Sequence, residues 1–251
     1  RLSDTHVSAE DRQADVRAEV RFGRELAARI LGRHPLVEDE DLLRYVNLVG
    51  RAVARSASRP ELTFRFGVLD TDSVNAFAAP GGYVFVTRGA LDQMRSEAEL
   101  AGVLAHEVAH VGRRHIVEEL GIKGSEGSAA AGFARFLGGA GEATRMAFSQ
   151  AVDRAVEILF ESGRKRADEL EADRVGTFLL AVSGYRPGAL RDYLERVSRK
   201  AGDSTADRRR THPPFPDRIA ALGEVMAQEG LAESGGARRA ERFARHVPAA
   251  D

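Results

Sequence analysis

Cysteine is absent from this 251-residue chain, which excludes disulfide bonds and every thiolate-ligated metal site. The chain also lacks an excess of charge of one sign, because 37 basic residues oppose 38 acidic ones and leave a formal charge of −1. Such a balance gives no reason to expect binding to nucleic acid. No apolar run approaches the length of about 18 residues that indicates a membrane-spanning helix. The length of the chain predicts a single domain over residues 1–251, which is large enough to bury a sizeable core.

The most informative feature that is present is the segment His106-Glu107-x-x-His110. On a helix, His106 and His110 are one turn apart, so both imidazoles reach one point on one face. The surrounding residues are apolar or small nearly all round, which predicts a buried helix. A glutamate buried between histidines costs several kcal/mol unless it is paired. Bound Zn²⁺ removes that cost and makes Glu107 a general base toward a zinc-activated water. The alternative is an ordinary core helix with satisfied histidines.

A third metal ligand at the metzincin spacing is excluded, because Arg113 and Ile116 stand where glycine and histidine would be needed. His115 falls one residue too early for that role. We expect His115 at the end of the helix, where its positive charge would suit the helix dipole. A carboxylate further along the chain is therefore the better candidate for the third ligand.

That carboxylate is found on a second predicted helix. Glu169 and Asp173 are spaced i, i+4 and share a face with the small residues Ala172 and Gly176, which would let two helices approach closely. Glu169 is then the predicted third ligand, and Asp173 would accept a hydrogen bond from a liganding histidine. Glu171 points roughly the opposite way and is expected to pair with neighbouring basic residues. An exposed, charged helix is the alternative.

Taken together, the zinc-binding pattern of His106 and His110 followed by Glu169-x-x-Ala172-Asp173 resembles the M48 family of zinc metallopeptidases, which are gluzincins. Residues 75–89 are similar to the strand segment that precedes the zinc helix in soluble, exported members. Residues 211–219 resemble the family's His-Pro motif near its C-terminal end.

The resemblance implies an α+β, zincin-like fold, mostly helical, with a small sheet whose edge strand borders the active-site helix. It implies one Zn²⁺ per chain, held by His106, His110 and Glu169, and an endopeptidase that uses Glu107. Substrates would be unfolded or misassembled cell-envelope proteins, because strand pairing reads backbone more than side chain. A zinc-containing binding or chaperone-like module with little proteolysis is the rival hypothesis, and the presence of Glu107 argues against it. A purely structural zinc site is disfavoured, since three protein ligands leave a position open.

The resemblance also implies a periplasmic or outer-membrane-associated location in a bacterium. Because the chain begins at Arg1, we expect that an export signal, and with it a lipid anchor, preceded it. Oligomeric state and cleavage preference cannot be read from the sequence.

Hydrophobic periodicity predicts an N-terminal helix over about 6–32. The resemblance implies a catalytic core over about 60–230, followed by a C-terminal tail over about 231–251. Strands are expected at 62–68 and 83–87. Further helices are predicted at 39–56, 88–94, 95–115, 145–162, 164–183, 187–200 and 216–229.

The resemblance also implies a function for strand 83–87 as the edge strand that pairs with extended substrate, through Gly82, Tyr83 and Val84. The neighbouring pair Gly81-Gly82 fits a close backbone approach there, or simply a turn between two core strands. Residues 121–143, which are rich in glycine and alanine, fit either a lid over the cleft or a loosely packed helix and loop.

His212 precedes a proline, which favours an extended backbone that could aim the imidazole into the cleft. It would act there as a catalytic hydrogen-bond donor or as a fourth, inhibitory zinc ligand, or else belong to a structural turn. Arg218, six residues further on, could face the same oxyanion.

Overall fold

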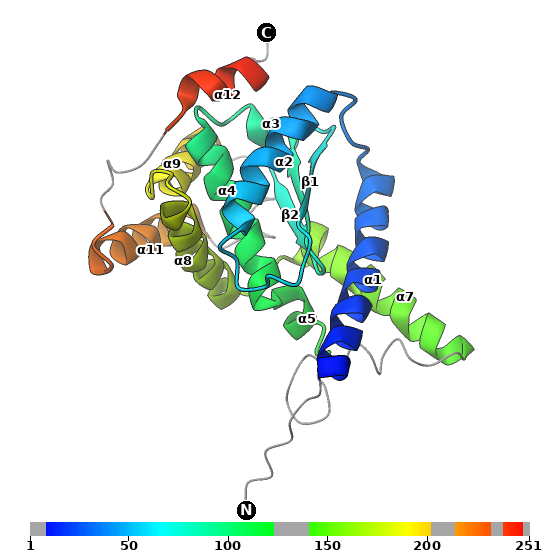
Figure 1. The fold of residues 1–251 in the computed structure, drawn as a ribbon. Helices are drawn as coiled ribbons and strands as arrows, with labels where there is room; N and C mark the ends of the chain where they lie inside the picture. Colours follow the sequence, from blue (N-terminus) through cyan, green and yellow to red (C-terminus); the bar gives the residue numbers. More distant parts are fainter. Residues whose placement is uncertain (1–8, 123–140, 202–213, 232–237, 248–251) are drawn as a thin grey trace, which may run out of the picture.

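The computed structural model describes residues 9–122, 141–201, 214–231 and 238–247 of the chain. Helices surround a small sheet (Figure 1). In chain order the elements are α1 (Ala9–Arg33), α2 (Glu40–Ala54), β1 (Arg65–Leu69), β2 (Ala76–Ala79), β3 (Tyr83–Thr87), α3 (Arg88–Leu91), α4 (Glu97–Arg113), α5 (His115–Glu119), α7 (Glu142–Glu157), the π-helix η1 (Ile158–Ser162), α8 (Arg166–Val182), α9 (Ala189–Ala201), α11 (Phe215–Gln228) and α12 (Ala240–His246). The predicted α+β, mostly helical fold class is confirmed.

Among the described residues the strand order is β1-β3-β2, with β1 parallel and β2 antiparallel to β3. The prediction that residues 83–87 form an edge strand is wrong, because β3 is hydrogen-bonded on both sides. The edge that packs against α4 belongs to β2, a strand that was not predicted. Gly81 and Gly82, with φ angles of 76° and 93°, lie between β2 and β3. They form the turn that was the alternative prediction for this glycine pair.

Alternating side chains place the sheet between two apolar cores. The core shared with α2 and α4 receives Phe66, Val68, Ala76, Ala78, Val84 and Val86 from the strands. The core shared with α1, α7 and η1 receives Leu69, Phe77, Ala79 and Phe85. Figure 1 shows α1 on one side of the strands and α2 with α4 on the other. Helices therefore cover both faces, and α4 is held between the sheet and α8.

The single helix predicted over 95–115 is two helices. Ser96 caps α4 by accepting a hydrogen bond from the backbone N–H of Glu99, and every residue from Glu97 to Val111 is buried. The helix ends at Arg113 because Arg114 adopts a left-handed conformation with φ of 61°. The short helix α5 then starts at His115, so the chain changes direction just behind His110.

The segment expected as a C-terminal tail contains α12, whose Phe243 is buried in the core shared with α2 and α4. His212 and residues 123–140 of the predicted lid lie outside the described residues. In the part of the chain that is described, no helix is both long enough and apolar enough to span a bilayer.

Candidate metal centre

His106 and His110 lie one turn apart on α4, with their rings turned toward the same point. Their Nε2 atoms are 3.1 Å apart, and both side chains are buried. Glu169 reaches this point from the first turn of α8, with Oε1 3.2 Å from Nε2 of His110 and Oε2 3.6 Å from Nε2 of His106. The structure thus brings together the three predicted ligands in one buried cluster.

Close packing of α4 and α8 depends on Gly176. A Cβ at this position would lie 2.9 Å from the backbone nitrogen of His106 and 3.0 Å from its Cα. Real Cβ atoms do not approach backbone so closely, so a side chain at 176 would push the helices apart. Ala172, one turn earlier on α8, is also buried. The small residues predicted to allow this approach therefore lie at the contact.

The donor set fits a metal ion. Zinc with nitrogen and oxygen ligands at about 2.0–2.1 Å in a tetrahedron holds its ligand atoms about 3.3–3.4 Å apart. The two imidazole nitrogens are 3.1 Å apart, and each lies 3.2 or 3.6 Å from one of the two oxygens of Glu169, which is close to that value. Two imidazoles and one carboxylate, with a fourth position left open, are also a common donor set of catalytic zinc.

The charges around the cluster favour a cation as well. Within contact distance lie the carboxylates of Glu107, Glu169 and Asp173 and the guanidinium groups of Arg164 and Arg218. With neutral imidazoles, the three carboxylates exceed the two guanidinium groups by one negative charge. All five side chains are buried, so water does little to screen that excess, and a bound cation would balance it.

Burial and the charged neighbours shift the pKa values of the two histidines in opposite directions. Burial lowers the pKa of His110 well below its usual value, and Arg164 adds to the effect, so its ring is held in the neutral form that binds metal. Burial and Arg218 also lower the pKa of His106, but Asp173 and Glu169 outweigh them and raise it to about 9. Positive charge is therefore favoured at His106, where a metal ion would replace the proton.

Asp173 lies behind His106, away from the cluster. Its Oδ1 is 2.9 Å from Nδ1 of His106, as expected of a carboxylate that orients a liganding histidine. Arg218 donates to both carboxylate oxygens of Asp173, at 2.8 and 2.6 Å. Burial raises the pKa of Asp173, but Arg218 and His106 outweigh it and hold the pKa below its usual value. Arg218 also lies 3.5 Å from Glu169, so it forms ion pairs with two carboxylates of the site. The predicted contact between Arg218 and an oxyanion stays a prediction.

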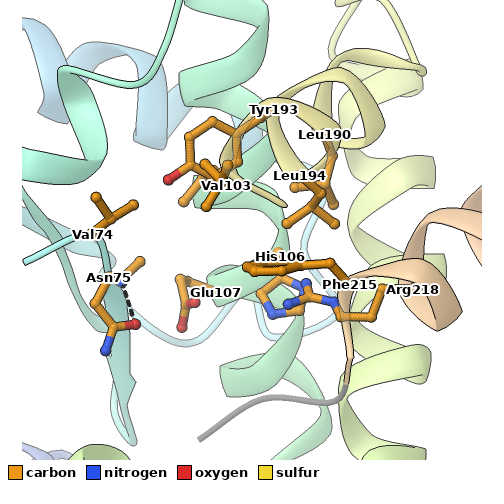
Figure 2. A pocket seen from close by; sticks show the side chains of 12 residues that line it. Val74, Asn75, Val103, His106, Glu107, Leu190, Tyr193, Leu194, Phe215 and Arg218 are labelled. Carbon is orange, nitrogen blue, oxygen red and sulfur yellow. Dashed lines mark hydrogen bonds between the residues drawn. The ribbon is translucent and has the colours of Figure 1, made fainter. Parts of the chain in front are cut away.

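Glu107 lies beside the cluster and lines a pocket together with His106 and Arg218 (Figure 2). Its Oε2 atom accepts no hydrogen bond from the described residues, and Nη2 of Arg164 lies 3.9 Å away. The same Arg164 nitrogen is 3.4 Å from the backbone oxygen of Ala78 on β2. A carboxylate of this kind is available to accept a proton from a molecule in the pocket. Arg164 was not predicted as a site residue.

Apolar side chains from α4, α9 and α11 form the rest of this pocket, and Val74, Asn75 and Ala76 form its border toward the sheet (Figure 2). The apolar part consists of Val103, Leu190, Tyr193, Leu194, Val197 and Phe215. The pocket therefore runs from Glu107 to an apolar interior, beside the start of β2.

The sequence predicts His115 at the end of the helix that carries His106 and His110, and the structure places it directly after that end, at the start of α5. The ring is buried, its Nδ1 atom lies 2.8 Å from Nδ1 of His110, and its Nε2 atom lies 3.3 Å from Oε2 of Glu171. Glu171 does pair with basic neighbours, namely His115 and Arg113. The helix break at Arg114 returns His115 to His110, and helical periodicity alone could not reveal that.

The predicted substrate strand is not supported in the form proposed. Tyr83 and Val84 belong to β3, whose backbone pairs with β1 and β2, and Gly82 lies in the preceding turn, where its carbonyl accepts from Arg65. An added strand needs free backbone groups, so these residues cannot pair with substrate in this sheet.

Sequence comparisons identify the family. Residues 42–226, well over half of the chain, match Peptidase family M48. Over 210 residues the chain is 30% identical to the beta-barrel assembly-enhancing protease of Escherichia coli (strain K12), covering 80% of this chain and 42% of that protein. It is 28% identical over 179 residues to mitochondrial metalloendopeptidase OMA1 of Arabidopsis thaliana, covering 71% and 35%. A protease HtpX homolog of Burkholderia mallei is 34% identical over 177 residues, covering 65% and 60%.

The chain thus spans less than half the length of the first two of these relatives. The extent of the family match, together with the buried cluster of two histidines and a glutamate, leads to one conclusion: this chain belongs to peptidase family M48.

Proposed function

We propose that this chain is the catalytic part of a zinc-dependent endopeptidase, with Zn²⁺ bound by His106, His110 and Glu169. The observation that carries the proposal is the position of Glu107, whose carboxylate adjoins the cluster and borders the same pocket. A metal site with a structural role alone would not need a free carboxylate and an open pocket beside it.

When bound, zinc supplies Lewis-acid activation of a water molecule and of the scissile carbonyl. Glu107 accepts the proton of the attacking water and passes it to the nitrogen of the leaving amine. Asp173 holds the ring of His106, and Arg218 holds Asp173 in turn. His212 would donate to the developing oxyanion or bind the metal as an inhibitory ligand, and the two roles predict opposite effects of His212→Ala on turnover.

The substrate would lie in extended form along β2, where it would displace the side chains of Asn75 and Arg164 from the backbone groups of Ala76 and Ala78. This strand is the sheet edge nearest α4, and Asn75 and Ala76 at its start border the pocket. Addition of a substrate strand uses backbone groups and so tolerates many side chains. The apolar interior between α4 and α9 would then take one apolar substrate side chain next to the scissile bond. Unfolded chains offer both features, whereas folded proteins hide them.

We extend this proposal to unfolded or misassembled proteins of the cell envelope as substrates, and to a periplasmic, outer-membrane-associated location. The E. coli relative's name refers to β-barrel assembly, which is consistent with such substrates. Because this chain matches only part of that protein, the substrate and the location are inferred for the chain and are tested separately from the chemistry.

The direct test is a cleavage assay of the zinc-loaded chain on an unfolded outer-membrane β-barrel protein, beside the same protein in its folded form. We expect cleavage of the unfolded form only. Glu107→Gln keeps the size of the side chain but removes the base, and should lower cleavage by about 10²–10⁴-fold while zinc stays bound.

Glu118→Gln is the matched control, since Glu118 is exposed on α5, and it should cleave at the wild-type rate. If Glu107→Gln cleaved the unfolded substrate at the wild-type rate, the proposed mechanism would be contradicted, and the rival hypothesis of a zinc-containing binding module would be favoured. Cleavage of the folded and unfolded forms at equal rates would leave the chemistry intact and overturn the proposed substrate class.

A further inference from the structure

His115 and Glu171 lie behind His110, on the side of its ring that faces away from the metal cluster. We propose that these two residues form a hydrogen-bonded relay that fixes the tautomer and the orientation of the His110 ring for metal binding. The inference rests on the proposed metal site and adds two positioning residues to it.

The three side chains are connected in a line. Nε2 of His110 faces the cluster, 3.2 Å from Oε1 of Glu169. Nδ1 on the other side of the same ring lies 2.8 Å from Nδ1 of His115. Nε2 of His115 is then 3.3 Å from Oε2 of Glu171. Each imidazole therefore uses both of its nitrogens, and the line ends on a carboxylate.

Hydrogen-bonding chemistry gives this line one direction. A nitrogen that binds a metal must present its lone pair, so His110 carries its proton on Nδ1 and donates it to Nδ1 of His115. His115 then carries its own proton on Nε2 and donates it to Glu171. An ionised carboxylate only accepts, so the chain of donors cannot run the other way. Reversal would put a proton on Nε2 of His110 and block the ligand position.

Local structure explains why His115 is available. The left-handed turn at Arg114 ends α4 and sends the chain back, so the next residue turns its ring toward His110. Arg113 holds the other oxygen of Glu171, with Nε 3.0 Å from Oε1. The histidine is buried, whereas the side chain of Glu171 is 46% exposed. Because water screens Glu171, we expect removal of His115 to have the larger effect.

The two ligand histidines thus have unequal support. His106 contacts a carboxylate directly, since its Nδ1 lies 2.9 Å from Asp173. His110 reaches its carboxylate only through a second imidazole. Outer partners of liganding histidines typically contribute about 10–100-fold to metal affinity. We expect His115 to act within that range.

The test compares two substitutions that separate a relay from simple packing. His115→Asn keeps an oxygen acceptor near the position of Nδ1 but loses most of the ring. His115→Phe keeps the ring volume but has no acceptor. A relay predicts that His115→Phe weakens Zn²⁺ binding by about 10–100-fold and that His115→Asn restores most of the affinity. Packing alone predicts the opposite order.

Zinc dissociation constants are measured by competition with a chromophoric chelator, and the Co²⁺-loaded proteins are compared by their visible absorption spectra. His115→Phe should alter the cobalt spectrum, because the His110 ring is no longer held. Arg174→Gln is the matched control, since it removes an exposed ion pair of α8 that does not touch the relay, and it should leave both readouts unchanged. Glu171→Ala should weaken zinc binding less than His115→Phe does.

Nitrogen NMR of the histidines in the zinc-loaded wild-type protein needs no substitution, and it decides the question even if His115→Phe does not fold. We expect His115 as the Nε2–H tautomer and His110 as the Nδ1–H tautomer. An Nδ1–H tautomer of His115, or wild-type affinity and spectrum in His115→Phe, overturns the relay. If the wild-type chain binds no zinc, the proposed metal site itself fails, which a relay failure with normal wild-type binding does not imply.

Discussion

Helix α4 carries a buried charged cluster at each end, and the two clusters are built on different principles. Near the N-terminal end, the carboxylate of Glu97 accepts hydrogen bonds from Tyr45 at 3.0 Å, Tyr185 at 2.6 Å and Arg239 at 3.2 Å, and from Arg242. Every partner there is a donor, so the charge is satisfied within the protein.

Near the C-terminal end the arrangement is reversed. The cluster of His106, His110 and Glu169 turns acceptor atoms toward one another, and the surrounding carboxylates outnumber the guanidinium groups. Burial of charge is expensive in both places, but only the first cluster contains its own compensation. The difference shows how buried charge can mark either a structural tie or a metal site, depending on whether donors and acceptors balance.

The largest expected effect comes from removing a ligand. Glu169→Gln is nearly isosteric but loses the negative charge. It should lower zinc affinity by more than about 100-fold, which is the upper end of the effect of residues that only contact a ligand. Glu171→Gln, on the same helix but outside the cluster, should lower affinity by less than about tenfold. Chelator competition measures both. The reverse ranking would mean that α8 presents a different face to α4.

Glu97→Gln should give the largest loss of stability without loss of metal. The substitution removes the charge of a fully buried carboxylate that two partly exposed arginines and two buried tyrosines share, and a hydrogen bond to a charged group typically contributes about 1.5–3 kcal/mol. Denaturant unfolding of the zinc-loaded protein measures the loss, and zinc stoichiometry should stay at the wild-type value. Unchanged stability would contradict the view of Glu97 as a structural tie.

The same substitution has a predictable dependence on pH. Burial raises the pKa of Glu97, but hydrogen bonds from Arg242, Tyr185 and Tyr45 outweigh burial and hold the pKa below its usual value. Its contribution to stability is therefore complete above the carboxyl pKa of the unfolded chain, about 4.3, and is lost as the pH falls through the folded value. The difference in unfolding free energy between wild type and Glu97→Gln should be large at pH 7 and shrink in acid; a gap that widened in acid would have the wrong sign.

A smaller effect is expected from Asp173→Asn, about 10–100-fold in zinc affinity, because Asp173 acts on the metal only through His106. The amide still offers an oxygen to the His106 ring but no longer balances Arg218. Calorimetric titration with zinc checks the value. A loss as large as that of Glu169→Gln would indicate that Asp173 is itself a ligand.

The smallest effect should come from an exposed ion pair between Arg174, on the same helix as Glu169, and Glu229 at the end of α11. Arg174 and Glu229 are 3.2 Å apart, with side chains 55% and 37% exposed. Glu229→Gln should change the free energy of unfolding by less than about 1 kcal/mol and leave zinc affinity unaltered. If Glu229→Gln lowered the free energy of unfolding as much as Glu97→Gln does, the exposure of an ion pair would not predict its contribution to stability in this molecule.

The family and the fold class could be predicted from the sequence because they depend on the spacing of residues within single helices. His106 and His110, and again Glu169 and Asp173, are one helical turn apart, so the phase of each helix alone brings each pair onto one face. The family predicted from these motifs is confirmed by the match over residues 42–226.

What could not be predicted depends on contacts between distant parts of the chain. Strand order is one example: three of the four residues of β2 are alanine, which is depleted in strands, so the sequence does not reveal that β2 rather than β3 is the edge. The Glu97 cluster is another, since its partners come from α2, α12 and the segment after α8. The contact between His115 and His110, only five residues apart, is a third example, because a non-glycine residue in a left-handed conformation gives little local signal.

The central claim, that one cluster of α4 needs a cation and the other does not, is tested most directly by thermal unfolding with and without added zinc. Zinc at about 1,000 times its dissociation constant should stabilise the wild-type chain by about 4 kcal/mol. Glu97→Gln should start from a lower stability and gain the same increment, whereas Glu169→Gln should gain less than about 1.4 kcal/mol. An equal gain for Glu169→Gln, or the loss of the gain in Glu97→Gln, would contradict the account.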